Sequence, residues 1–144
     1  MHNKSFLSVL EQVCMILFFS LAAAVALQGF ALAESISDKR DTLEYAVVAV
    51  QNAAETVKSC KGDFVRAADL LSGTGDDDSF SVSYDEKGSA CSVSSPSSEK
   101  FILVTQKTDS DNPLLGCAYI QAICDDTTIF SLTVCWQEGQ PYES

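Results

Sequence analysis

The sequence predicts an α+β fold, in which a long N-terminal helix packs on a small antiparallel sheet of four or five strands. Three observations indicate this fold. Residues 13–33 are apolar and uncharged, residues 34–58 place apolar side chains at helical spacing, and apolar residues alternate with polar ones after residue 79. We therefore expect an entry segment (1–12), a transmembrane helix (13–33) and an extracytoplasmic domain (34–144).

The apolar segment, Val13–Ala33, has no charge in 21 positions, which matches the ~20 residues that a helix needs to cross a bilayer. The acidic, cysteine-containing remainder favours a single-pass topology with the N-terminus inside and the domain outside. A signal peptide is the alternative, because Ala31-Leu32-Ala33 has the small-x-small form of a cleavage site. Cleavage after Ala33 would release a secreted binding module that starts at Glu34. Without cleavage and without a filament role, the chain would be a single-pass, membrane-anchored binding module. The acid at Glu11 and the length of the segment favour its retention as a membrane anchor. Both alternatives stay open.

Glu11 lies at the entry to the apolar segment and has two interpretations. It is either an interfacial acid that the helix dipole favours, or a carboxylate within the membrane. A carboxylate in lipid is costly and needs a partner, such as the free amine of a neighbouring subunit. In the second case membrane insertion would be coupled to assembly.

Residues 5–58 resemble the type IV pilin-like proteins, including the minor pilins and type II secretion pseudopilins of Gram-positive bacteria. The stretches that carry the resemblance are Phe6–Glu11, Ile16–Ala22 and Ala46–Glu55, together with the closing strand Ile129–Val134. The resemblance implies insertion with the N-terminus inside, cleavage by a prepilin peptidase, and helices that pack against one another in a filament.

The resemblance also implies a processing site at Ser5, Phe6 and Leu7, and a pairing role for Glu11. The family places an acid at the fifth residue after the cut. A cut before Leu7 makes Glu11 the fifth residue, and a cut before Phe6 makes it the sixth. The expected partners are other pilin-like subunits, the membrane and a prepilin peptidase. The expected location is the cell membrane or a filament on the cell surface.

The helix is expected to continue beyond the apolar segment, because residues 1–60 contain no proline. It is either one continuous helix or two helices joined near Gln28-Gly29. The predicted buried stripe follows the spacing i, i+4, i+7, i+11 and i+14, at Leu43, Val47, Val50, Ala54 and Val57. Gly62 is expected to end the helix, and Asp63 to cap a short helix over Phe64–Leu71. A loop follows at Ser72–Asp78.

The strands come next and are separated by turn residues. They are expected around Phe80–Tyr84, Ala90–Val93, Phe101–Val104, Leu115–Cys124 and Thr128–Trp136, with turns or loops at Asp85–Gly88, Ser94–Ser98, Asp109–Pro113 and Asp125–Thr127. The last two strands form the clearest hairpin. Its apolar face carries Ala118, Ile120, Ala122, Phe130, Leu132, Val134 and Trp136, and its polar face carries Tyr119, Gln121, Ser131 and Thr133.

Five cysteines lie outside the apolar segment and are candidates for disulfides in an oxidising exterior. The predicted hairpin places Cys117 opposite Cys135, so this pair is the first candidate. Cys60 with Cys91 is a weaker candidate. Cys14 lies in the apolar segment and is expected to be a small buried hydrophobe. A zinc site would need four scattered cysteines to converge, and the chain has no CxxC motif.

The formal net charge of −11 disfavours nucleic acid as a partner. The aspartate clusters lack the ligand spacing of a calcium loop, so no metal is expected. The only histidine is His2, which leaves the cysteines and serines of the domain without a histidine base. No phosphate-binding loop is present either. The sequence therefore predicts a structural or assembly protein, without a cofactor, rather than an enzyme.

Overall fold

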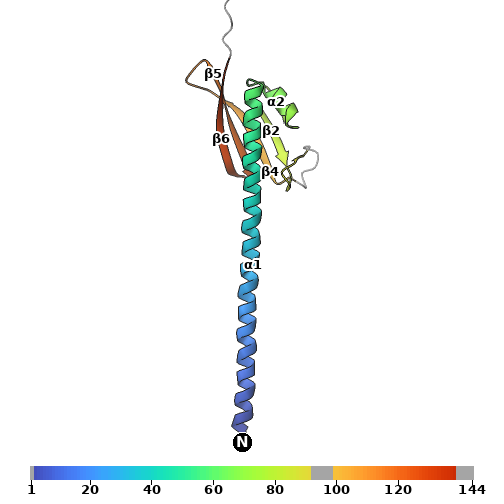
Figure 1. Ribbon diagram of the computed structural model, residues 1–144, viewed down its shortest axis with the longest axis vertical. Helices are drawn as coiled ribbons and strands as arrows, with labels where there is room; N and C mark the ends of the chain where they lie inside the picture. The colour runs from blue at the N-terminus through green and yellow to red at the C-terminus, as the bar shows by residue number, and fades with distance from the viewer. Residues whose placement is uncertain (1, 92–98, 139–144) are drawn as a thin grey trace, which may run out of the picture. The chain divides into compact units, whose positions relative to one another are not determined.

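The computed structural model describes residues 2–91 and 99–138. Its residues form two compact units, 1–39 and 40–144, and the second is called the head below. Helix α1, His2–Ser59, runs through both units, and a six-stranded antiparallel sheet lies in the head (Figure 1). The predicted α+β class, with a long N-terminal helix and an antiparallel sheet, is confirmed.

Helix α1 is continuous, so a break near Gly29 does not occur. Gly29 sits within the helix with no heavy atom of another element near it, and glycine in a helix interior is tolerated at a cost of about 1 kcal/mol. The helix ends at Ser59, and shortly after it Lys61 and Gly62 adopt positive φ angles of 52° and 82°. The Gly62 amide donates to the Val57 carbonyl at 3.0 Å, which satisfies one of the last carbonyls of the helix.

Helix α2, Phe64–Leu70, begins where the sequence predicts it. The Asp63 side chain caps it by accepting a hydrogen bond from the Arg66 amide at 3.0 Å. Its buried side chains are Phe64, Ala67 and Ala68, so this short helix is held mainly by packing against the rest of the head.

Six strands follow: β1 (Thr74–Gly75), β2 (Ser79–Tyr84), β3 (Ala90–Cys91), β4 (Phe101–Thr108), β5 (Leu115–Cys124) and β6 (Thr127–Gln137). Their order is β1-β2-β4-β5-β6, and β3 pairs with β2 beside β1. The strand β1 was not predicted and lies in the expected loop Ser72–Asp78. Strand β4 is four residues longer than the predicted Phe101–Val104. The end of the predicted strand Ala90–Val93 and the loop Ser94–Ser98 lie outside the described residues.

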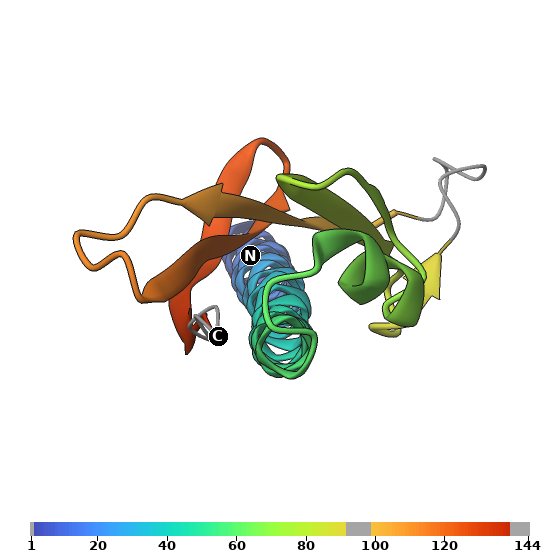
Figure 2. The ribbon, with the colours of Figure 1, turned by 90° about the horizontal axis from the view of Figure 1, so that it is seen from above.

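The part of α1 that belongs to the head covers one face of the sheet (Figure 2). Its buried stripe consists of Thr42, Ala46, Ala49, Val50, Ala53, Ala54 and Val57. The predicted stripe was partly wrong, because Leu43 is 43% exposed and Val47 is only partly buried. Alanines let the helix backbone approach the sheet, whose large side chains Phe80, Phe101, Leu103 and Ile120 fill the core.

The hairpin of β5 and β6 turns at Asp125 and Asp126, whose φ angles of 48° and 60° are those of a two-residue turn. The predicted three-residue turn was therefore wrong, and Cys124 pairs with Thr127 rather than Thr128. Ile129 is an extra residue on β6 and forms a bulge. From the pair Ala122 and Phe130 to the pair Cys117 and Cys135, the register is therefore the predicted one.

Candidate functional site

The first candidate site is the N-terminal part of α1, where every described side chain from Asn3 to Asp41 is exposed. Large apolar side chains are included, such as Phe6 at 69% and Phe19 at 80% exposure. Cys14, expected to be buried, is exposed as well. By length and composition α1 is apolar enough to cross a membrane. Signal sequences near an N-terminus meet the same criterion, so an anchor and a cleavable segment both remain open.

The predicted processing residues Ser5, Phe6 and Leu7 all lie within the first turns of α1, and each is exposed. Glu11 lies one turn beyond Leu7, on the same helical face by the i, i+4 rule. Across residues 2–91 and 99–138, no cationic group forms an ion pair with Glu11. The carboxylate at the entry to the apolar segment therefore depends on solvent or on another molecule for compensation.

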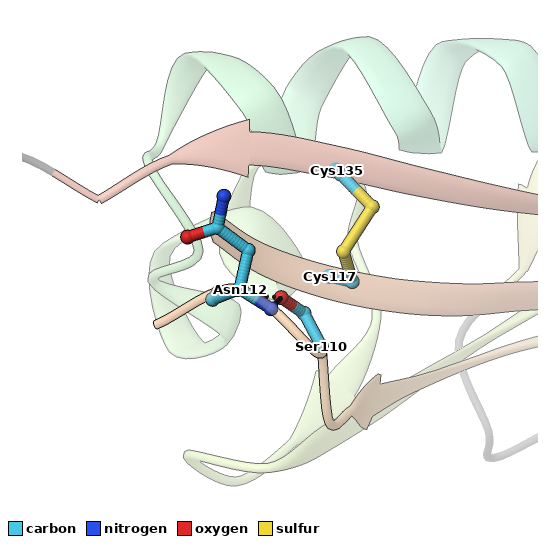
Figure 3. The surroundings of a disulfide bond; sticks show 4 residues. All are labelled: Ser110, Asn112, Cys117 and Cys135. Carbon is cyan, nitrogen blue, oxygen red and sulfur yellow. Dashed lines mark hydrogen bonds between the residues drawn. A yellow bond between two sulfur atoms is a disulfide. The ribbon is translucent and has the colours of Figure 1, made fainter. Parts of the chain in front are cut away.

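The disulfide Cys117–Cys135 joins directly opposed residues of β5 and β6, as predicted (Figure 3). The Cα atoms of the pair are 4.1 Å apart. The weaker candidate pair, Cys60 with Cys91, does not form a disulfide. Cys60 packs against the core at the end of α1, while the Cys91 sulfur lies 3.7 Å from the Ser89 carbonyl oxygen.

The loop between β4 and β5 lies beside this disulfide and is closed by its own side chains (Figure 3). Ser110 donates its hydroxyl to the Asn112 carbonyl and accepts from the Asn112 amide, at 2.6 and 3.1 Å. The Asn112 side chain accepts from the Leu114 amide, and the Leu114 carbonyl accepts from the Glu138 amide. The end of β6 is therefore held by strand pairing with β5 and by a hydrogen bond to this loop.

We expect loss of the disulfide to lower the stability of the head without changing its strand pairing. Replacing Cys117 and Cys135 together by alanine should lower the free energy of unfolding by about 2–3 kcal/mol, because an 18-residue cross-link no longer restricts the unfolded chain. Urea titration followed by fluorescence of the single tryptophan, Trp136, measures the change. Cys14→Ala, outside the head, is the control. Equal midpoints for the double variant and this control would contradict the prediction.

The aspartates of the head stabilise turns. Asp76 Oδ1 accepts from the Asp78 amide and from the amide and hydroxyl of Ser79, and these hydrogen bonds lower the pKa of Asp76. Asp85 Oδ1 likewise accepts from the Lys87 and Ser89 amides. Among the described residues, no three His, Cys, Asp or Glu side chains gather as a metal site.

Cys124 is the thiol at the tip of the hairpin, and its environment disfavours the reactive thiolate. Burial raises the pKa of Cys124, and the negative charge of the adjacent Asp125 raises it further. The thiol donates weakly to the Asp125 carboxylate, with the two atoms 3.8 Å apart. This arrangement fits a structural residue at the margin of the core.

Two features of the head were not predicted. Trp136 lies between Gly62, after α1, and Gly116, in β5, and a Cβ atom at either glycine would overlap its indole ring. Within residues 2–91 and 99–138, strand β6 pairs only with β5 and forms a long edge of the sheet. The first depends on residues far apart in sequence and leaves no periodic signal. The second leaves no signal in composition, because edge strands commonly carry a charge and Thr127–Gln137 has none.

No protein family, curated protein or solved structure matches the chain. The architecture alone, a long apolar N-terminal helix and an antiparallel sheet packed on its later part, fits a pilin-like fold in general terms.

Proposed function

We propose that this protein is a structural subunit of a membrane-associated assembly, a pilin-like protein of a type IV pilus, competence or type II secretion-like system. The observation that carries the proposal is the exposure of the large apolar side chains of α1 from Phe6 to Leu32. Such a stretch needs lipid or other helices around it, because soluble monomers rarely expose so large an apolar surface. Helices of other copies meet that need.

The composition of α1 supports the same proposal. One helix supplies both the exposed apolar segment and the buried stripe that completes the core of the head. Membrane helices that pack together favour small residues at their contacts, and the apolar segment contains Ala22-Ala23-Ala24 among its large side chains. Glu11, without a cationic partner in the described residues, would pair with a positive group such as the amine of a processed neighbour.

The mature N-terminus tests the proposal. Mass spectrometry of the protein purified both from the membranes and from the culture medium should identify a chain that starts at Phe6 or Leu7. A start at Glu34 would overturn the proposal and support a secreted binding module. An intact Met1 would indicate a plain membrane anchor without pilin processing.

We expect Glu11→Gln to impair assembly and to leave membrane insertion unchanged. The substitution keeps the size of the side chain but removes the charge that a neighbouring amine would require. Breaking a charge pair in a low-dielectric environment costs several kcal/mol, so cross-linked multimers should fall at least about tenfold. The measurement is chemical cross-linking in intact cells, with membrane fractionation to verify insertion.

Glu34→Gln is the matched control, since Glu34 is also an exposed acid of α1 but lies beyond the apolar segment. It should assemble as the unmodified protein does. Normal multimers of the Glu11→Gln protein would argue against the pairing role.

A further inference from the structure

The two edges of the sheet are built differently. One edge ends in β1 and β3, each only two residues long, whereas the other is the eleven-residue strand β6. Among the described residues, β6 pairs with β5 alone (Figure 1). Short, interrupted strands protect an edge from pairing with other chains, and a long regular strand does not.

The composition of β6 leaves this edge open to pairing. Thr127–Gln137 contains no charged residue and no proline, although the whole chain has a net charge of −11. Edge strands of soluble proteins commonly carry a charge, often lysine, that prevents pairing. Because β6 has no charge, a second β6 can lie beside it without placing like charges opposite each other.

The disulfide shows which backbone groups of β6 face the free edge. The Cα separation of 4.1 Å between Cys117 and Cys135 is that of a narrow, non-hydrogen-bonded pair, so the amide and carbonyl of Cys135 point away from β5. By the alternation of an antiparallel ladder, the same holds for Thr133 and Ser131. All three residues are exposed. Their donors and acceptors are available to another strand.

The side chains of β6 complement a second copy when the two strands are antiparallel and centred on Thr133. Thr133 then faces its own symmetry mate, and Ser131 faces Cys135 of the second copy, which gives an uncharged polar row on the outer face. On the core face, Leu132 faces Val134 of the second copy. Leu132 is 37% exposed in the single chain although it lies on the core face, and this pairing would cover it.

From these observations we propose that two copies of the chain join edge to edge through β6, antiparallel and centred on Thr133, so that their sheets become one continuous sheet. The contact is isologous, and each copy contributes the same strand. The regular part of the contact is Phe130–Trp136, since the bulge at Ile129 interrupts the strand beyond it. This proposal rests on β6 alone and does not depend on the pilin-like function.

A cysteine at the centre of the contact tests the register. In the full chain in detergent, Thr133→Cys should form a disulfide between two copies under mild oxidation, and mass spectrometry should identify a peptide pair joined through the two introduced thiols. Thr128→Cys is the control, at another exposed position of the same strand. Its symmetry mate would lie ten residues away along the ladder, about 30 Å at the rise of a strand, so it should not cross-link with itself. Equal cross-linking at both positions would overturn the register.

Charge substitutions test the contact itself. Thr133→Lys and Thr133→Glu should each reduce the dimer fraction at least tenfold, and an equal mixture of the two proteins should restore it as a heterodimer. Thr128→Lys should leave the dimer unchanged. Restoration in the mixture demonstrates that both variants are folded.

Because lysine and glutamate have nearly equal masses, one of the two variants is uniformly labelled with a heavy nitrogen isotope before mixing. Native mass spectrometry then distinguishes the two homodimers and the heterodimer by mass. A wild-type protein that is monomeric at about 100 μM, or a mixture that stays monomeric, would overturn the proposal. Association through α1 would give multimers that none of the Thr133 variants affects, and that result would also overturn it. A mature chain that begins at Glu34 would refute the pilin-like function but leave these results unchanged.

Discussion

Gly62→Ala is expected to lower the free energy of unfolding of the head by about 3 kcal/mol. Gly62 has a φ of 82°, which an alanine adopts only at a cost of about 1–2 kcal/mol. In addition, a Cβ atom at this position would overlap the indole of Trp136, and overpacking of a well-packed site costs about 1–3 kcal/mol. Gly62 also donates the hydrogen bond that closes the end of α1, so the indole and this turn cannot both keep their positions.

The measurement is proteolysis of the full chain after brief exposure to graded urea, because the added methyl group changes the surroundings of Trp136. Gly29→Ala is the matched control, because Gly29 lies inside α1 with no heavy atom of another element near its would-be Cβ. This control should leave the midpoint of head unfolding unchanged. If Gly62→Ala unfolds at the same urea concentration as the control, the close approach between Gly62 and Trp136 is not required for stability.

The sequence predicted the elements of the head better than the contacts between them. Its strands follow from alternation, and the pairing of Cys117 with Cys135 follows from a hairpin with the right overall register. The turn was nevertheless one residue too long in the prediction. The bulge at Ile129 compensated for that error, and nothing in the local sequence distinguishes a three-residue turn from a two-residue turn followed by a bulge.

The buried stripe of α1 shows a second limit of prediction from sequence. Hydrophobicity ranks Leu43 above Ala46, yet Leu43 is 43% exposed and Ala46 is fully buried. Which side chain is buried depends on how closely the helix approaches the sheet. That distance is set by the side chains of both elements, so the helix sequence alone does not predict it. At the N-terminus, the apolar segment follows from composition and does not depend on tertiary contacts. The pairing role of Glu11 stays a prediction.

Phe64→Ala is expected to lower the free energy of unfolding of the head by about 3–5 kcal/mol, the largest effect of any single change considered. Phe64 is 1% exposed and is the first residue of α2. Removing a buried phenylalanine side chain loses its transfer free energy and leaves a cavity. Its ring also lies 6.0 Å from that of Phe80 and 6.2 Å from that of Trp136, and such aromatic pairs contribute about 1 kcal/mol each.

Because this substitution changes the surroundings of Trp136, proteolysis after brief exposure to graded urea is the appropriate measurement. Val65→Ala is the matched control, since Val65 is the next residue of α2 and is 44% exposed. It should cost less than about 1 kcal/mol. Phe64→Leu, which keeps an apolar side chain but no ring, should fall between the two. Equal losses for Phe64→Ala and Val65→Ala would mean that α2 contributes little to the core. The α1 stripe and the sheet would then hold the head together without it, and Phe64 would not be the link between α2, β2 and β6.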